Sequence, residues 1–329
     1  TMYMEKGLDT GDMIDKAEVV LDKKETAGSL HDKLMVLGAD LLLETLKKLE
    51  DGTAVREKQN DEESCYAKML SKDMGQIDFT KSAREIELMA EAGRILEIVH
   101  NELRDALHAG MSTLDIDRLG EEIIRSYDCI PSFLNYNGYP ASICVSLNQE
   151  VVHGIPDKHR LIQDGDIVSL DAGVIYKGYH SDAARTYGVG EISKEAKNLM
   201  QITKECFFEG IKYAREGNHL FDISGAIGDY AKEHGYGVVR DLCGHGIGTH
   251  LHEAPEIPNF RMNRKGMLLK AGMTLAIEPM ITAGGHEVDW LDDDWTVVTR
   301  DGSLAAHYEN TVLITEGEPK LLSLSEKVL

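Results

Sequence analysis

A pair of aspartates in one predicted β-hairpin constrains this chain more than any other feature of its sequence. The stretch LDAGVIYKGYHSDAART, residues 170–186, has apolar and aromatic flanks on either side of a Lys-Gly pair that suits a two-residue turn. In that register Gly173 faces Asp182. Because side chains alternate along each strand, Asp171 and Asp182 become diagonal neighbours on one face. Two ionised carboxylates this close repel each other, so one is protonated, both point to water, or a cation lies between them.

Composition narrows the class of protein. The chain has 329 residues, a net charge of -22 and 42% hydrophobic residues, which is typical of a globular protein. The acidic excess is spread along the chain and argues against phosphate-directed binding of nucleic acid. There is no apolar run long enough to cross a bilayer and no signal peptide, so we expect a cytoplasmic protein. The five cysteines include no CxxC pair, which favours reduced thiols.

Three later segments supply further candidate metal ligands. CGHGIGTHLHEAP contains His245 among glycines, LAIEPM places Glu278 at the end of an apolar strand, and HYENTVLIT places Glu309 just before one. Each is weak alone, because such residues are more often satisfied turn or surface groups. Together with the hairpin they give four carboxylates and one imidazole. Such an oxygen-rich set suits two divalent ions of the Mn, Fe(II), Co or Zn type better than one structural zinc.

The first eighty residues have a different pattern from the rest. Residues 26–52 predict one amphipathic helix, with Ser29 as its cap and Gly52 as its end. A Glu-rich stretch follows, and residues 82–107 predict a second helix. Beyond it, strands bounded by glycines alternate with helices to the end of the chain.

Residues 81–326 resemble the type I, bacterial-pattern methionine aminopeptidases. The matching strings, in order, are NYNGYPASICVSLNQEVVHGIP, GDIVSLDAGVIYKGYHSDAART, CGHGIGTHLHEAP, LAIEPM and HYENTVLIT. The resemblance implies an α+β pita-bread fold over residues 81–329, in which two pseudo-symmetric halves pack helices on antiparallel strands and hold the metals between them.

The same resemblance implies a role for each candidate residue. Two divalent metal ions would be bound by Asp171, Asp182, His245, Glu278 and Glu309, with Asp182 and Glu309 bridging both. A hydroxide between the ions would attack the first peptide bond, with Glu278 as proton shuttle. His252 would hold the substrate carbonyl and His153 the scissile nitrogen. The methionine pocket would be formed by Tyr136, Tyr139, Cys144 and Trp295.

The implied activity is removal of the initiator methionine from N-terminal methionyl peptides and nascent chains when the next residue is small. Phe133 and Leu251 occupy positions at which the family varies, so they could tune that preference. We expect a monomer that binds neither membrane nor nucleic acid directly, and association with the ribosome is left open.

Residues 1–80 resemble a different family, methionyl-tRNA formyltransferase. The strings MEKGLDTGDMI, TAGSLHDKL and YAKMLSKDMGQIDFTKSA carry the resemblance, and Asp9 matches a catalytic aspartate. The other catalytic parts of that family have no counterpart here. We therefore expect an incomplete α/β segment without formyltransferase activity, joined to the second part within residues 78–88 by a gene fusion or a misassembled reading frame.

Three alternatives remain open at this point. The first is a proline-specific peptidase of the same fold, and the second is a pita-bread binding protein that has lost catalysis. The third is a bifunctional formyltransferase-aminopeptidase within a longer chain.

Overall fold

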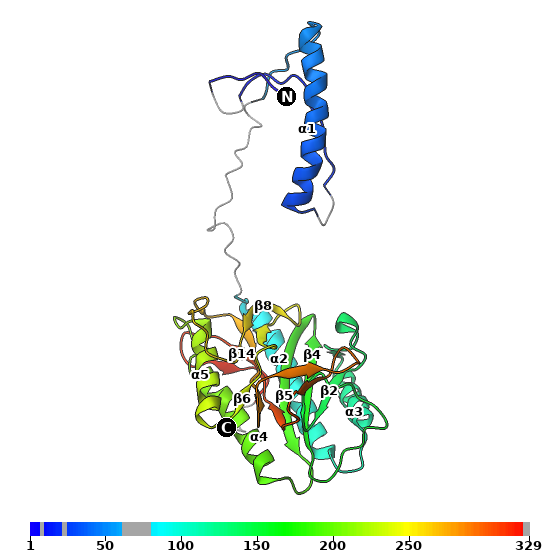
Figure 1. The fold of residues 1–329 in the computed structure, drawn as a ribbon, viewed down its shortest axis with the longest axis vertical. Helices are drawn as coiled ribbons and strands as arrows, with labels where there is room; N and C mark the ends of the chain where they lie inside the picture. The colour runs from blue at the N-terminus through cyan, green and yellow to red at the C-terminus, as the bar shows by residue number, and fades with distance from the viewer. Residues whose placement is uncertain (7–9, 22–24, 61–79, 325–329) are drawn as a thin grey trace. The chain divides into compact units, whose positions relative to one another are not determined.

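The protein divides into two compact units in the computed structural model, residues 1–76 and 77–329 (Figure 1). The structure describes residues 1–6, 10–21, 25–60 and 80–324. Asp9, with its predicted role, and the first two positions of the predicted junction at residues 78–88 lie outside these ranges. Each unit is described by itself below.

The first unit is organised around one long helix, α1 (Ala27–Glu50), with isolated β-bridges that join Met2 to Met13 and Met13 to Glu57. The helix lies where the sequence predicts it, but the predicted cap is wrong. Thr26 is the N-cap and accepts from the Ser29 backbone N–H at 3.1 Å, while Ser29 completes a capping box. The Thr26 side chain starts the helix one turn earlier than the hydrophobic periodicity suggests.

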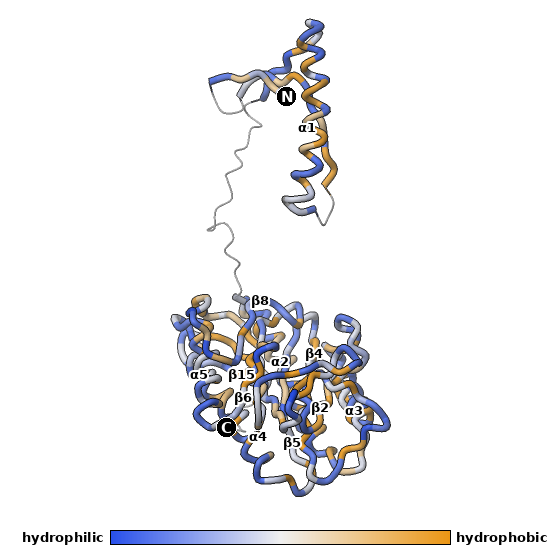
Figure 2. Tube along the Cα trace, in the orientation of Figure 1, coloured by the Kyte–Doolittle hydropathy of each residue, from blue (hydrophilic) through white to orange (hydrophobic). Residues whose placement is uncertain are grey.

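Much of the apolar surface of α1 is exposed within the first unit. The side chains of Leu34, Leu42 and Leu46 are about half exposed, and apolar stretches along α1 are visible in Figure 2. In the described ranges, no helix of the protein is long and apolar enough to cross a membrane.

The second unit begins with two helices packed on a sheet. Helix α2 (Ala83–Ala106) starts at the N-cap Ser82 and packs on strands β4 and β5, and α3 (Thr113–Ser126) packs on α2. The sheet has the order β1-β4-β2 with β5 paired to β4, and its strands are β1 (Ile130–Pro131), β2 (Ile143–Leu147), β4 (Ile167–Tyr176) and β5 (Tyr179–Gly188).

The predicted hairpin is confirmed, and its register is the predicted one. Strands β4 and β5 pair antiparallel, with Gly173 opposite Asp182. Lys177 and Gly178 form the turn with φ of 49° and 87°, the left-handed values that a tight hairpin turn requires. The two aspartates therefore share one face of the sheet.

The rest of the second unit repeats the pattern of two helices and antiparallel strands. Helices α4 (Lys194–Ile211) and α5 (Leu220–Glu233) pack on each other, and Figure 1 shows α3 and α5 on opposite sides of the unit. A five-stranded sheet has the order β15-β14-β9-β7-β8, with strands β7 (Gly244–Gly246), β8 (Glu253–Ile257), β9 (Thr274–Ile277), β14 (Asn310–Leu313) and β15 (Lys320–Leu321).

Two three-stranded sheets complete the unit. Their orders are β13-β10-β6 and β11-β12-β3, and their strands are β3 (Glu150–Val152), β6 (Gly237–Val238), β10 (Met280–Thr282), β11 (Val288–Trp290), β12 (Val297–Thr299) and β13 (Ala305–His307). Separate apolar clusters fill each half, one beneath α2 and α3 and one beneath α4 and α5. The strands between these cores carry the site.

Truncation of Phe207, in the apolar cluster beneath α4 and α5, tests how much that cluster contributes to stability. Phe207 is fully buried and contacts Phe208 and Tyr308 edge-on or tilted. Phe207→Ala should lower the free energy of unfolding by about 3–5 kcal/mol because it leaves a cavity. Urea unfolding followed by tryptophan fluorescence reports this unit, since both tryptophans lie in it.

Leu268→Ala, at a leucine that is 48% exposed, serves as the control and should change the stability by less than about 0.5 kcal/mol. Equal effects of the two substitutions would contradict this account of the core.

Candidate active site

The residues selected from the sequence line one cavity of about 110 Å³ in the second unit. It brings together the five predicted ligands and the six predicted substrate contacts, although they are spread over more than 170 positions of the chain. The lining residues are Phe133, Tyr136, Asn137, Tyr139, Cys144, His153, Asp171, Asp182, His245, Leu251, His252, Glu278, Trp295 and Glu309.

Hydrogen bonds from β5 to Glu309, just before β14, and to Thr311, within β14, align Asp182 with Glu309. The Thr311 hydroxyl accepts from the Asp182 N–H at 2.8 Å and donates to the Asp182 carbonyl at 3.0 Å. The Glu309 N–H donates to the Ala184 carbonyl at 3.0 Å. The Thr311 side chain thus takes the place of a backbone partner for Asp182. Together these hydrogen bonds bring one carboxylate from each half of the unit into the same cavity.

Glycines allow His245 to lie between close strands. A Cβ on Gly244 would lie 2.4 Å from the Ala276 carbonyl oxygen, and one on Gly246 would lie 2.2 Å from that of Ala254. Both are below any real Cβ contact, so these positions require glycine. The close approach places His245 next to the carboxylate that follows β9.

The orientation of the His245 ring identifies its free nitrogen. Nδ1 lies 2.9 Å from the Gly246 carbonyl oxygen and must donate to it, which leaves the lone pair on Nε2. Nε2 is 3.9 Å from Asp182 Oδ2 and 3.7 Å from Glu278 Oε1. Burial lowers the pKa of His245 to about 3, so the ring is neutral at pH 7. A neutral ring with a directed lone pair is suited to bind a metal ion.

The carboxylates around this ring lack compensating groups from the protein. Among the residues that the structure describes, the buried atoms Asp171 Oδ1, Asp182 Oδ1 and Glu309 Oε1 have no hydrogen-bond partner. Burial raises the pKa of Asp171 to about 7 and raises the pKa values of Asp182, Glu278 and Glu309 well above their usual range. Such groups are stable at neutral pH as a protonated cluster or around cations.

The donor set fits a divalent metal ion. One ligand atom each from Asp182, His245 and Glu309 lies within 4.8 Å of the other two, and all three residues are buried. Carboxylate oxygens with one imidazole nitrogen are typical ligands of Mn, Fe(II), Co and Zn. Asp171 and Glu278 line the same cavity and extend the set.

Two further histidines, His153 and His252, line the same cavity. Tyr136 Oη lies 3.0 Å from His252 Nδ1 and leaves Nε2 available to a ligand. Glu253, the next residue, accepts from Lys81 Nζ at 2.7 Å, which ties this loop to the start of α2. His153 has a φ of 60° and lies 6.3 Å from Trp295 between ring centroids. Burial lowers its pKa to about 4, so this ring is also neutral.

The remaining lining is apolar and aromatic. Tyr139 contacts Trp295 edge-on at 5.1 Å and donates through Oη to the Gly154 carbonyl at 3.0 Å. Together with the buried Phe133, Cys144 and Leu251 they form a wall against which an unbranched apolar side chain can pack.

Sequence reasoning missed two residues behind the ligands. His307 Nε2 lies 3.6 Å from Glu278 Oε2, and the Arg185 guanidinium donates to the Glu309 carbonyl and, at 2.6 Å, to Asn310 Oδ1. His307 could have been considered, because it lies only two positions before the predicted ligand Glu309. Nothing local indicated Arg185, since its partners are more than 120 residues away.

Comparison with known proteins gives concordant matches over the second unit. The profile of metallopeptidase family M24 matches residues 87–316. A methionine aminopeptidase of Clostridium acetobutylicum is 53% identical over 246 residues, which cover 75% of this chain and 98% of that protein.

Solved structures match the same region. The crystal structure of methionine aminopeptidase from Thermotoga maritima aligns with a TM-score of 0.74 and 42% identity, covering 76% of this chain and all of that one. A Xaa-Pro dipeptidase from Bacillus anthracis aligns with a TM-score of 0.60 and 25% identity, over 75% of this chain and 62% of that one.

The raised pKa values predict how metal and pH act together on stability. In the metal-free fold the cavity carboxylates stay protonated to higher pH than in the unfolded chain, so their contribution to stability is present below about pH 4 and is lost as pH rises towards 7 and above. Metal binding needs the ionised carboxylates. Added Mn²⁺ should therefore raise the melting temperature more at pH 7.5 than at pH 5.5, as measured by calorimetry on metal-stripped protein.

The double variant Asp182→Asn/Glu309→Gln is the control, and its melting temperature should respond little to Mn²⁺ at either pH. An equal rise at both pH values, or an undiminished rise in the variant, would contradict this account of the cavity.

Proposed function

The chain belongs to metallopeptidase family M24, and from this premise we infer that it is a methionyl aminopeptidase, a hydrolase that removes the initiator methionine. The observation that carries this inference is the cavity itself. A neutral histidine and a set of carboxylates without counter-charge line the same cavity as a group of apolar and aromatic side chains. Metal-assisted hydrolysis next to an apolar side chain is the chemistry that this arrangement serves best.

We propose that the cavity holds two divalent ions, of the Mn, Fe(II), Co or Zn type. The ligands would be Asp171, Asp182, His245, Glu278 and Glu309. The four negative charges of these carboxylates balance the four positive charges of two divalent ions. A single divalent ion would leave two negative charges uncompensated. When bound, the metal supplies a Lewis acid and makes water a nucleophile at neutral pH.

The chain's own residues orient the substrate and move protons. Glu278, with a carboxylate near both His245 and His307, would accept the proton of the attacking water and deliver it to the departing amine. His252 would donate from Nε2 to the carbonyl oxygen as charge develops on it, held in place by Tyr136. His153 would contact the nitrogen of the bond that breaks.

The slot formed by Tyr136, Tyr139, Cys144 and Trp295 would bind the methionine side chain. Phe133 and Leu251 line the same small cavity, which supports a preference for small second residues. The proposed substrates are N-terminal methionyl peptides and nascent chains in the cytoplasm, with the protein acting as a monomer.

The proline-specific rival is the weaker reading of the same fold. This chain covers 62% of the Xaa-Pro dipeptidase at 25% identity, against nearly all of the methionine aminopeptidases at higher identity. The intact ligand set equally disfavours a binding protein without catalysis.

We propose that residues 1–80 are an incomplete formyltransferase-like segment without that activity, and that residues 81–329 are the aminopeptidase domain. The support is the set of sequence strings in the first unit and its separation from the second. The M24 profile begins only at residue 87, so it does not include this segment. A longer natural chain could restore a bifunctional protein.

Release of methionine from the peptide Met-Ala-Ser tests the activity. Metal-stripped protein should be inactive and should recover with one or more of Mn²⁺, Fe²⁺, Co²⁺ and Zn²⁺. Asp182→Asn should lower kcat/KM by about 100-fold or more, because it removes a charged ligand. The surface variant Asp289→Asn, in the exposed part of β11, should match the wild type.

An Ala-Pro peptide run in parallel distinguishes the rival. Faster cleavage of Ala-Pro than of Met-Ala-Ser would replace the proposed function with proline-specific hydrolysis. A folded, metal-loaded protein that releases nothing from either peptide would support the binding-protein alternative.

The contact between Tyr136 and His252 gives a second prediction. Tyr136→Phe removes only the hydroxyl, and the loss of one neutral hydrogen bond should lower kcat by about 2–13-fold. KM should change less, because the ring still lines the slot. Steady-state kinetics on Met-Ala-Ser measure both constants, with Tyr127→Phe, at an exposed tyrosine outside the cavity, as the control. An unchanged kcat would show that the hydroxyl does not position His252.

A further inference from the structure

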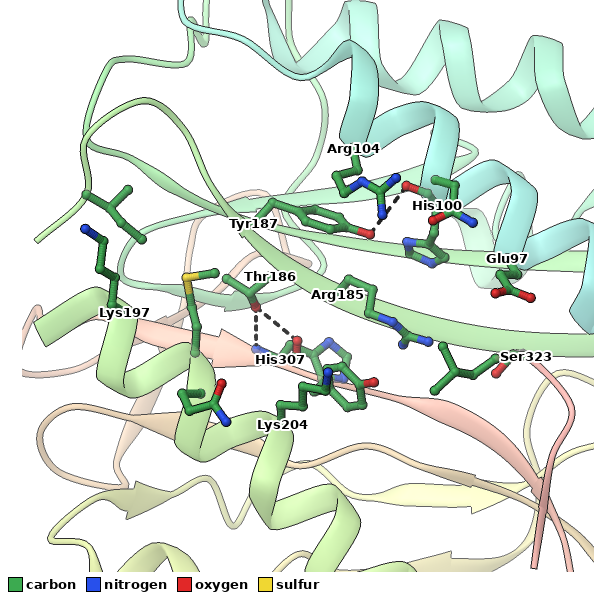
Figure 3. A pocket seen from close by; sticks show the side chains of 16 residues that line it. Glu97, His100, Arg104, Arg185, Thr186, Tyr187, Lys197, Lys204, His307 and Ser323 are labelled. Atoms are coloured by element: carbon green, nitrogen blue, oxygen red, sulfur yellow. Dashed lines mark hydrogen bonds between the residues drawn. The ribbon is translucent and has the colours of Figure 1, made fainter. Parts of the chain in front are cut away.

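A second and larger cavity, of about 340 Å³, lies behind the metal ligands in the second unit. Figure 3 shows its walls: α2 carries His100 and Arg104 on one side, α4 carries Lys197 and Lys204 on the other, and Arg185 of β5 projects between them. The cavity belongs to a different face of β5 from Asp182, because Arg185 and Asp182 differ in parity along the strand. None of the proposed catalytic groups lines it.

The charge of this cavity is opposite to that of the chain. Its lining includes the cations Arg104, Arg185, Lys197 and Lys204 and a single carboxylate, that of Glu97. The whole chain has a net charge of -22. Four cations line one hollow of this acidic protein, and a bound anion would reduce the repulsion between them.

The two lysines are available to a ligand. Within the described part of the chain, no carboxylate lies within ion-pair distance of Lys197 or Lys204. Lys204 Nζ lies 5.8 Å from the centre of the Phe208 ring, and Lys197 is exposed at the rim of the cavity. Among the described residues, the ion-pair partner of Arg104 is its neighbour Asp105, at 2.8 Å. The two side chains are 49% and 71% exposed, so this pair contributes little stability.

The cavity also has apolar and polar walls that suit an organic ligand. Ile192, Met200 and Leu324 contribute apolar surface. The buried His100 ring donates through Nε2 to the Ala183 carbonyl at 2.8 Å, which leaves Nδ1 as an acceptor without a partner among the described residues. A hollow of this volume, with apolar walls and several cations in its lining, is typical of a small-molecule site.

We propose that this cavity binds a phosphate monoester, with the phosphate between Arg104, Lys197 and Lys204 and the organic group against the apolar wall. Lysine ammonium groups and a guanidinium from facing helices match a doubly charged phosphate better than a single carboxylate. The cavity assignment stands apart from the proposed peptidase activity.

Two lining residues connect the cavity to the metal ligands. The Arg185 side chain stacks on Tyr308 at 4.5 Å and donates to the Glu309 carbonyl, and His307 lies 3.6 Å from the Glu278 carboxylate. A ligand that shifts either side chain would shift a carboxylate of the metal centre. Occupancy of the cavity is therefore expected to change the rate of methionine release.

Calorimetric titration of the metal-loaded full chain with phenyl phosphate tests the site. The double variant Lys197→Gln/Lys204→Gln should bind at least about tenfold more weakly than the wild type, since it loses two charge-assisted contacts. The matched control is Lys194→Gln/Lys212→Gln, which removes the same charge from the first residue and the C-cap of α4, outside the cavity, and should bind like the wild type. Any phosphate that binds to the metals remains in all three proteins, so the difference isolates the cavity.

Equal affinity in the three proteins, or no binding by any, would overturn the site. Succinate is titrated in parallel, and succinate binding as tight as that of phenyl phosphate would overturn the phosphate assignment. The response of methionine release to phenyl phosphate should be larger in the wild type and the control than in the cavity variant, which keeps only the response due to phosphate at the metals. Binding without any change in release would overturn the coupling while leaving the site itself in place.

Discussion

The mutual repulsion of four clustered carboxylates, three of them buried, is the constraint around which the second unit is built. Placing one ionised carboxylate in a protein interior costs several kcal/mol, and Asp171, Asp182, Glu278 and Glu309 lie around one cavity with no lysine or arginine in its lining. The protein gives them no salt bridge to lysine or arginine side chains in the described residues. Their ionisation at neutral pH therefore depends on cations from outside the chain.

The fold brings these carboxylates together from both halves of the unit and restricts the positions of their backbones. The β4–β5 hairpin fixes two aspartates by strand parity, and the Thr311 hydroxyl joins β5 to β14 through two hydrogen bonds to Asp182. Gly244 and Gly246 let His245 approach between neighbouring strands. Since Asp171, Asp182 and His245 lie in paired strands and the Glu309 N–H is bonded to the Ala184 carbonyl, most of the site is organised before any metal binds, and this preorganisation favours both affinity and catalysis.

Local patterns predicted those parts of the site that depend on local rules. The register of the hairpin follows from a two-residue turn and an alternation of period 2, so it was predictable from residues 170–186 alone. Glu278 and Glu309 stood out because each lies at the end of an apolar strand. The resemblance to a known family, rather than any local rule, gave His153 and His252 their expected roles. Thr311 and Arg185 were not predicted, because their hydrogen bonds join segments more than 120 residues apart.

The first unit also shows which features the sequence predicts and which it does not. Its helix was predictable from periodicity, whereas its true cap, Thr26, depended on a side-chain geometry that periodicity does not encode. The half-exposed leucines of α1 show that an apolar face does not by itself specify a partner.

The most direct test of the account is anomalous diffraction from crystals of the full chain grown with Mn²⁺. The account predicts two manganese peaks within bonding distance of the Asp182 and Glu309 carboxylates, with Asp171 beside one ion and His245 beside the other. An ordered cavity without an anomalous peak, or with manganese bound only elsewhere on the chain, would contradict the claim that cations compensate the buried carboxylates.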